Sequence, residues 1–121
     1  MTSYLLVALG GGIGASARFG LGQAFSRSDF PLGTLCANVL GGLLMGLLAG
    51  WLAGRTDSES LRLFIGVGLL GGFTTFSAFS LEIVAMMERG AWSAAFAYVL
   101  ASVVLSLSAC FAGLAVMRGI A

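Results

Sequence analysis

The side chains best suited to chemistry in this chain form one run at residues 71–82, GGFTTFSAFSLE. A glycine pair opens the run, and hydroxyls then alternate with phenylalanines inside otherwise apolar sequence. In a membrane interior, freed backbone groups and hydroxyls are costly unless they face protein, water or an ion. The run therefore predicts an ion-permeation or ion-binding site.

The glycine pair predicts a break in a helix, which would free backbone carbonyl oxygens. Each glycine in a helix interior costs about 1 kcal/mol relative to alanine, so two together weaken the helix at this point. Carbonyls of Gly71 and Thr74 from two copies of the chain, meeting at a two-fold axis, would offer four oxygens to a hard monovalent cation such as Na⁺. The alternative is a glycine kink that only permits close packing.

Two phenylalanines of the run, Phe76 and Phe79, can share a helix face and present their ring edges to one channel. Ring edges are electropositive, so a partly dehydrated anion could pass them without being held by a full charge. The hydroxyls of Thr75 and Ser77 lie beside these rings in the sequence. The alternative, phenylalanines that face lipid or a packed core, fits these interleaved hydroxyls less well.

A second polar group lies in the last apolar run, where Tyr98, Ser102 and Ser106 recur at intervals of four. This spacing places three hydroxyls on one helix face, where they could donate to an anion or bond to neighbouring helices. Asn38 adds an amide inside another apolar run. An unpaired amide would be costly there, so its side chain should face the protein interior.

Two ionisable residues, Arg18 and Glu82, lie well inside apolar runs. A rise of about 1.5 Å per residue places both toward the membrane side opposite the termini. Either they form an ion pair, or Arg18 lines a vestibule that attracts anions while Glu82 anchors the structure. We favour the second arrangement.

The composition excludes several classes of function. The chain has 121 residues, of which 59% are hydrophobic and 9% are charged, and it contains no Lys or His. A chain this apolar is a membrane protein. Without histidine or clustered acids, transition-metal, Ser-His and Cys-His catalysis have no residues to use, so we expect no enzyme activity. The scattered net charge of +1 offers no patch for nucleic acid, and Cys36 and Cys110 are expected to be small buried hydrophobes.

Four apolar runs are each long enough to cross a bilayer as a helix, which requires roughly 20 residues. They cover residues 4–25, 33–53, 61–87 and 91–117. The short connections imply helical hairpins, so consecutive helices should run antiparallel. We predict an all-α membrane protein with a single transmembrane domain, residues 1–121, whose third helix is broken near the middle of the membrane.

The positive charges do not define one orientation in the membrane. When each arginine is assigned to the nearer helix end, the two sides carry equal numbers: Arg55, Arg62 and Arg118 against Arg18, Arg27 and Arg89. A balanced distribution predicts insertion in both orientations and assembly as an antiparallel, dual-topology homodimer. A single orientation set by another signal is the alternative.

These residues resemble the small bacterial fluoride channels of the CrcB family, also called Fluc. The resemblance covers nearly the whole chain. It is carried by Gly14-Ala15 with Arg18-Phe19, by Pro31 to Leu35 with Asn38 and Gly41-Gly42, by residues 71–77 with Phe79, Ser80 and Glu82, and by Tyr98 with Ser102 and Ser106. The third of these motifs is the most specific.

The resemblance implies a passive, fluoride-selective channel in the bacterial inner membrane that exports cytoplasmic fluoride. It also implies a dual-topology homodimer with two pores and a structural Na⁺ at its centre, held by the carbonyls of Gly71 and Thr74, and a vestibule lined by Arg18. The ion pathway would contain Asn38, Phe76, Phe79, Tyr98, Ser102 and Ser106, to which we add the hydroxyls of Thr75 and Ser77. Ala78 is a departure, because many relatives carry Thr there.

Two other functions remain compatible with four short spans. A small dual-topology multidrug exporter would need a membrane carboxylate in the first span, which contains none. A non-transporting subunit of a larger membrane complex would not need hydroxyls and phenylalanines in the middle of the bilayer. Neither alternative accounts for the run at residues 71–82.

Overall fold

The computed structural model is all-helical, and it describes residues 1–27 and 30–120. Part of the first predicted connection and the last residue of the predicted domain therefore lie outside the described residues. Within them, four helical segments are long and apolar enough to cross a membrane. The elements are α1 (Thr2–Ala24), α2 (Leu32–Leu52), α3 (Glu59–Leu61), η1 (Arg62–Leu70), α4 (Gly71–Phe73), α5 (Ser77–Glu88) and α6 (Trp92–Ile120). The third segment, residues 59–88, is built from α3, η1, α4 and α5.

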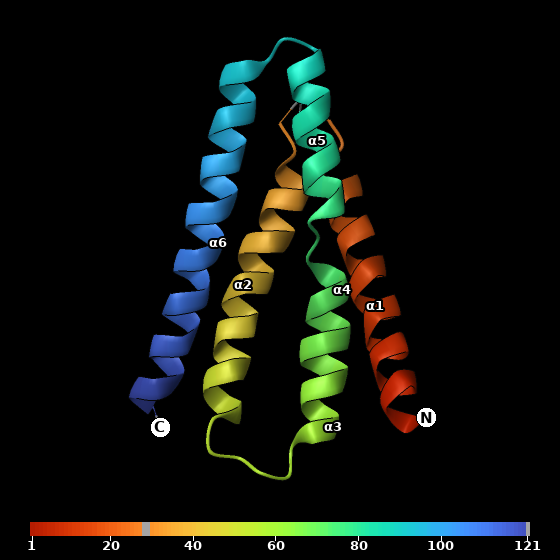
Figure 1. Ribbon diagram of the computed structural model, residues 1–121, viewed down its shortest axis with the longest axis vertical. Helices are drawn as coiled ribbons and strands as arrows, with labels where there is room; N and C mark the ends of the chain where they lie inside the picture. The colour runs from red at the N-terminus through yellow and green to blue at the C-terminus, as the bar shows by residue number, and fades with distance from the viewer. Residues whose placement is uncertain (28–29, 121) are drawn as a thin grey trace.

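Successive segments run in opposite directions, so both termini and the loop between α2 and α3 lie at one end of the molecule (Figure 1). The chain turns at Gly54 and Gly90, whose φ angles of 84° and 81° lie in the left-handed region. Glycine is favoured after a helix end because it adopts this conformation without steric cost. These glycines allow the short turns that return the chain into the bundle.

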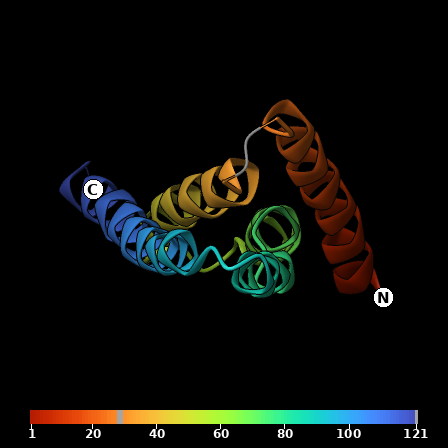
Figure 2. The ribbon, with the colours of Figure 1, turned by 90° about the horizontal axis from the view of Figure 1, so that it is seen from above.

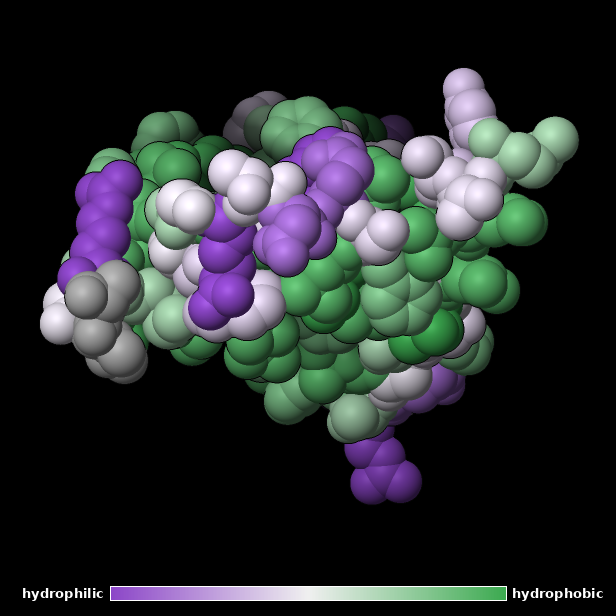
Figure 3. Space-filling model, turned by 90° about the horizontal axis from the view of Figure 1, so that it is seen from below, coloured by the Kyte–Doolittle hydropathy of each residue, from purple (hydrophilic) through white to green (hydrophobic). Residues whose placement is uncertain are grey.

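The third segment and α2 occupy the middle of the molecule, with α1 and α6 on opposite flanks (Figure 2). The closest packing joins α2 to α6 and α1 to η1 and α4. Large hydrophobic side chains such as Phe96, Phe111 and Leu81 are mostly exposed. Figure 3 views the end that carries the termini and shows a few hydrophilic groups on a surface that is otherwise largely hydrophobic. An apolar periphery of this kind suits a multi-pass membrane protein.

Glycines bring the backbones of neighbouring helices into direct contact. A Cβ atom at Gly14 would overlap the carbonyl oxygen of Leu69, and one at Gly46 would overlap the carbonyl oxygen of Cys110. Small residues at such positions let membrane helices approach closely and pack well. The α1–η1 and α2–α6 contacts therefore depend on the absence of a side chain at these positions.

The glycine pair is not where the third segment loses its helical form, so the predicted position of the break is wrong. Gly71 and Gly72 belong to α4, and the first extended residue is Thr74, with φ −88° and ψ 158°. A Cβ atom at Gly72 would lie 2.5 Å from the carbonyl oxygen of Gly11. Gly72 thus serves close packing against α1, while residues 74–76 form the non-helical connection to α5.

A second difference lies in η1, which is π-helical rather than α-helical. The amide of Gly71 bonds to the carbonyl of Gly66, five residues earlier. Gly68 of η1 contacts α1 directly, because a Cβ atom there would lie 2.9 Å from the carbonyl oxygen of Val7. Apolar periodicity does not distinguish a π-helix from an α-helix over so short a segment.

Substitution of Gly14 by alanine should destabilise the protein by about 1–3 kcal/mol, because the new methyl group would displace the η1 backbone. Gly12→Ala is the matched control, since a Cβ atom there meets nothing within 4 Å. Equilibrium unfolding of both variants in mixed detergent micelles measures the difference. Equal stability of the two variants would contradict a tight α1–η1 contact.

Candidate functional site

The non-helical residues 74–76 form the centre of the candidate site. Thr74 ends the preceding helix, because both its amide and its hydroxyl donate to the carbonyl of Leu70, each at 3.0 Å. Thr75 precedes Phe76, the N-cap residue of α5, and its hydroxyl accepts a 3.2 Å hydrogen bond from the amide of Ala78 in the first turn. This bond satisfies one of the amides that have no partner within the helix. The hydroxyl of Thr74 thus bonds to the end of the preceding helix, and the hydroxyl of Thr75 bonds to the first turn of the next one.

Asn38 on α2 holds this connection in place. Its Nδ2 donates to the carbonyl of Thr75 at 3.1 Å, and its Oδ1 accepts from the amide of Thr75 at 2.9 Å. One side-chain amide therefore replaces both backbone partners that Thr75 would have in a helix. Unpaired backbone groups are costly in a membrane interior, so this pair stabilises the non-helical conformation.

These hydrogen bonds release the two carbonyls that were predicted to hold a cation. In a continuous α-helix the amide of Thr75 would donate to Gly71, and the amide of Ala78 would donate to Thr74. Here the two amides donate instead to Asn38 and to the hydroxyl of Thr75. Gly71 and Thr74 both line the same groove, so their freed carbonyls are suited to a hard cation. Clusters of three or more His, Cys, Asp or Glu are absent from the described residues.

Arg18 lies on the other side of the connection. Its Nε donates to the carbonyl of Gly72 at 3.4 Å, close to the C-terminal end of α4. A positive charge is favourable at a helix C-terminus, where carbonyl groups lack helical donors. Arg18 therefore caps the short helix that precedes Thr74. It does not pair with Glu82, since the only ion pair among the described residues joins Arg62 to Glu59.

Glu82 connects three elements of the bundle. Its carboxylate accepts a 3.0 Å hydrogen bond from the hydroxyl of Thr34 on α2 and a 2.9 Å bond from the hydroxyl of Tyr98 on α6. Tyr98 is fully buried. Hydrogen bonds to a carboxylate are stronger than those between neutral groups, so Glu82 links α5 firmly to both neighbours.

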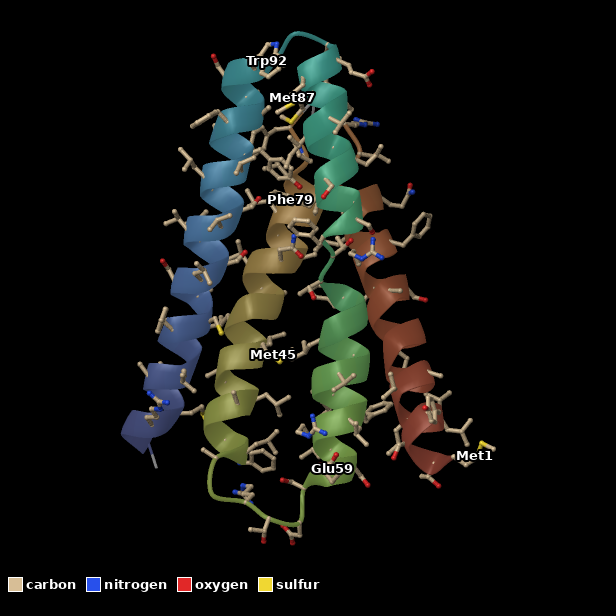
Figure 4. The ribbon with its side chains drawn as sticks, viewed as in Figure 1. Met1, Met45, Glu59, Phe79, Met87 and Trp92 are labelled. Carbon is tan, nitrogen blue, oxygen red and sulfur yellow. The ribbon has the colours of Figure 1, made fainter. Side chains whose placement is uncertain are left out.

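The aromatic rings form a cluster beside this network. The ring of Phe79 lies 5.1 Å from that of Tyr98 and 5.6 Å from that of Phe76, measured between centroids. Phe79 projects from α5 toward α2 and α6 (Figure 4) and is 7% exposed, whereas Phe76 is 76% exposed. The two pathway phenylalanines thus have different environments within one chain.

An open groove of about 540 Å³ brings most of the predicted site residues together. Its lining residues are Asn38, Gly41, Gly42, Met45, Gly71, Thr74, Thr75, Phe76, Phe79, Ser102, Val103, Ser106 and Cys110. These residues carry amide, hydroxyl and thiol groups but no full charge. The hydroxyl oxygens of Ser102 and Ser106 are buried and have no hydrogen-bond partner. A buried hydroxyl without a partner is uncommon, because desolvation costs about 1–3 kcal/mol, and it indicates that the groove accommodates a polar species.

Three predicted site residues lie outside this lining. Tyr98 is behind Phe79 and bonded to Glu82, Ser77 is exposed, and Arg18 is bonded to α4. Sequence reasoning missed Thr34, although its spacing of four residues from Asn38 places both on one face of α2. It also missed the groove position of Cys110, which is only partly buried.

Four membrane-length segments, three of which line a groove that contains uncharged polar and apolar side chains, define an α-helical multi-pass membrane protein. The family described as "CrcB-like protein, Camphor Resistance (CrcB)" matches residues 5–114. The chain therefore belongs to the CrcB family.

The chain is also similar over its full length to curated proteins of several bacteria. It is 52% identical to the fluoride-specific ion channel FluC of Novosphingobium aromaticivorans, with 100% of both chains covered. It is 53% identical to the protein of the same name from Caulobacter sp., over 99% of this chain and 98% of the other. It is 54% identical to the protein of the same name from Phenylobacterium zucineum, over 98% of this chain and 97% of the other.

Asn38→Ala should cost about 1–3 kcal/mol, because it leaves the amide and the carbonyl of Thr75 without partners. Hydrogen exchange at the amide of Thr75 should accelerate, and detergent unfolding should measure the loss of stability. Gln23→Ala is the control, since Gln23 is an exposed amide on α1. Unchanged exchange at Thr75 in the Asn38 variant would show that the pair does not stabilise the connection.

Proposed function

We propose that this protein is a fluoride-selective ion channel that passively exports cytoplasmic fluoride and so lowers its intracellular concentration and toxicity. Membership of the CrcB family and full-length similarity to proteins named fluoride-specific ion channel support this function. The structural observation that carries it is the pair of unpartnered, buried hydroxyls of Ser102 and Ser106 in a groove without full charges. Such a groove can replace part of the water around a small anion.

Permeation requires donors that are strong enough to attract an anion and weak enough to release it. Hydroxyls of Ser102 and Ser106 donate from one wall of the groove, and the rings of Phe76 and Phe79 present electropositive edges. Tyr98 packs against Phe79 and donates to Glu82, and it thereby links α6 to α5 beside the groove. The side chains of Thr75 and Ser77 and the amide of Asn38 extend the set of polar groups near the non-helical connection. Arg18, at the end of α4, adds positive potential that attracts anions to the approach.

The groove is open on one side, so a second copy of the chain would complete the pathway. Phe76 is 76% exposed and lines the groove, so within a single chain its ring lies open to the surroundings, and a second copy would enclose it. The balanced arginines favour an antiparallel, dual-topology homodimer, with the third helix broken at mid-membrane where the two copies meet. Labelling that finds only one orientation in native membranes would contradict this arrangement.

At the centre of that dimer, the carbonyls of Gly71 and Thr74 from both copies would hold a structural Na⁺. Their release from helical hydrogen bonding supports this role, because hard cations prefer oxygen ligands. The ion would fix the two copies against each other. Dimer stability that is independent of Na⁺ concentration would contradict the proposal.

The physiological role follows from the chemistry of hydrogen fluoride. In acid surroundings HF crosses a membrane as a neutral molecule and dissociates in the less acid cytoplasm, which traps the anion. A passive channel in the bacterial inner membrane lets the anion leave down the membrane potential. The channel needs no coupled substrate or enzyme activity.

Flux from liposomes tests the proposed function. Purified protein should release trapped fluoride electrogenically, without a proton gradient, and should retain chloride trapped in the same way. A multidrug exporter would depend on a pH gradient, and α1 carries Arg18 but no acidic residue for such coupling. Release that requires a pH gradient, or equal release of chloride, would overturn the channel.

Phe76→Ile and Phe79→Ile should each reduce fluoride flux while the dimer remains intact, because an aliphatic side chain lacks the electropositive ring edge. Phe96→Ile is the matched control, since Phe96 is 71% exposed and is not among the groove residues. Fluoride electrode recordings measure the flux, and size-exclusion chromatography measures whether the dimer is intact. Normal flux in both groove variants would remove the rings from the pathway.

A further inference from the structure

A second groove lies between α2 and η1, and most of its lining is separate from the groove of Ser102 and Ser106. Its volume is about 570 Å³, within the range of about 300–1,000 Å³ that is usual for small-molecule sites. Its lining residues are Met45, Leu48, Ala49, Leu52, Ala53, Arg62, Gly66, Val67 and Gly71. Only Met45 and Gly71 also line the first groove. Apart from Arg62, every residue of this lining is apolar.

The second groove exists because α2 and η1 do not pack backbone to backbone. These two elements contact each other much less than α2 contacts α6 or α1 contacts η1. A Cβ atom at Gly66 would meet only the tip of the Leu48 side chain, at 3.2 Å. Gly66 and Ala49 add little volume to the lining, so space remains between the two helices.

The second groove extends along one half of the membrane. On α2 its lining runs from Met45 to Ala53, a separation of eight residues, which corresponds to about 12 Å at about 1.5 Å per residue. Half of a bilayer's hydrocarbon core is about 15 Å thick. Glu59 lies at the end that carries the termini, and Met45 lies nearer the middle of the molecule (Figure 4). The groove thus has the length and direction of one acyl chain of a lipid.

The outer end of this groove carries charges of both signs. Arg62, at the rim, donates to the carboxylate of Glu59 on α3 through its Nε, at 3.2 Å, and through one of its terminal nitrogens. The two side chains are 50% and 68% exposed. A guanidinium has more N–H donors, and a carboxylate more acceptor sites, than this pair uses. Both groups can therefore bind a ligand without separating.

The adjoining end of α2 marks the level of the lipid headgroups. The guanidinium of Arg55 stacks over the ring of Trp51, 4.0 Å from its centroid, and its Nε donates to the carbonyl of Trp51 at 3.1 Å. Tryptophan and arginine at a helix end are typical membrane-surface anchors. Between Arg55 and Arg62 lie two acidic residues, Asp57 and Glu59, so this end has no excess of positive charge. Such a balance favours a ligand that carries both signs of charge over a purely anionic one.

We propose that the groove between α2 and η1 binds a phospholipid whose headgroup contains a phosphate and a primary ammonium group, as in phosphatidylethanolamine. One acyl chain lies along the apolar lining. The phosphate accepts hydrogen bonds from Arg62, and the ammonium group donates to Glu59. Burial of the chain and the two charge-assisted contacts supply the affinity. Phosphatidylcholine has no N–H donor for Glu59, and phosphatidylglycerol has no cation.

The test measures lipid binding to the full-length protein in detergent micelles by native mass spectrometry. Phosphatidylethanolamine, phosphatidylcholine and phosphatidylglycerol with identical acyl chains are compared at equal concentrations. Val67→Trp fills the groove. Its matched control is Val84→Trp, because Val84 on α5 is 49% exposed, similar to Val67 at 47%, and lines neither groove. Arg62→Gln and Glu59→Gln each remove one headgroup partner, and Arg118→Gln, at an exposed arginine of α6, is their control.

Phosphatidylethanolamine should bind the unaltered protein more tightly than the other two lipids. Val67→Trp should abolish this binding, and Arg62→Gln should weaken it about tenfold, as the loss of one charged hydrogen bond implies. Glu59→Gln should remove the preference for the ethanolamine over the glycerol headgroup and leave residual binding through Arg62. Both control variants should bind the lipid as the unaltered protein does.

Equal binding of the three lipids would overturn the proposal, and so would unchanged binding of phosphatidylethanolamine in Val67→Trp. The alternative occupant of the groove is a second copy of the chain. In that case the protein would retain no lipid and Val67→Trp would dissociate the dimer in size-exclusion chromatography, which would also overturn the proposal. None of these measurements uses fluoride efflux, so a failure of the proposed channel function is detected separately.

Discussion

The structure of the site depends on the double hydrogen bond between the side chain of Asn38 and the backbone of Thr75. It satisfies an amide and a carbonyl that a continuous helix would satisfy internally. Without it, a non-helical connection inside a membrane segment would leave costly unpaired groups. The same pairing deprives Gly71 of its helical donor, and the hydroxyl of Thr75 does the same for Thr74. A single side chain on α2 therefore shapes the third segment.

The surrounding elements hold this connection from two sides. Toward α1, glycine contacts place the backbones of α1, η1 and α4 together, and Arg18 bonds to the end of α4. Toward α6, Glu82 joins α5 to Thr34 and Tyr98, and Phe79 packs on Tyr98. The groove lies on the α6 side. Rigid contacts thus keep its hydroxyls and ring edges at fixed positions, as selective binding of a small ion requires.

The sequence predicted the helical membrane class well, because long apolar runs in a chain with 9% charged residues have few other solutions. It also predicted residues that the groove brings together, since spacing and hydroxyl content are local properties. It misplaced the interruption. The low helix propensity of glycine placed the break at Gly71 and Gly72. In the structure both residues are helical, and Gly72 allows α4 to pack closely against Gly11 of α1. The π-helical η1 was missed as well, because apolar periodicity does not distinguish a π-helix from an α-helix over nine residues.

The sequence by itself determined the apolar segments, the hydroxyl and phenylalanine run, and the spacing of Ser102, Ser106 and Cys110, because each follows from residue type and helical periodicity. The tertiary structure decided which groups meet. It paired Asn38 with Thr75, placed Tyr98 on Glu82 instead of in the groove lining, and brought Cys110 to the groove. These outcomes depend on the relative rotation and approach of helices, which glycine contacts between segments distant in sequence set.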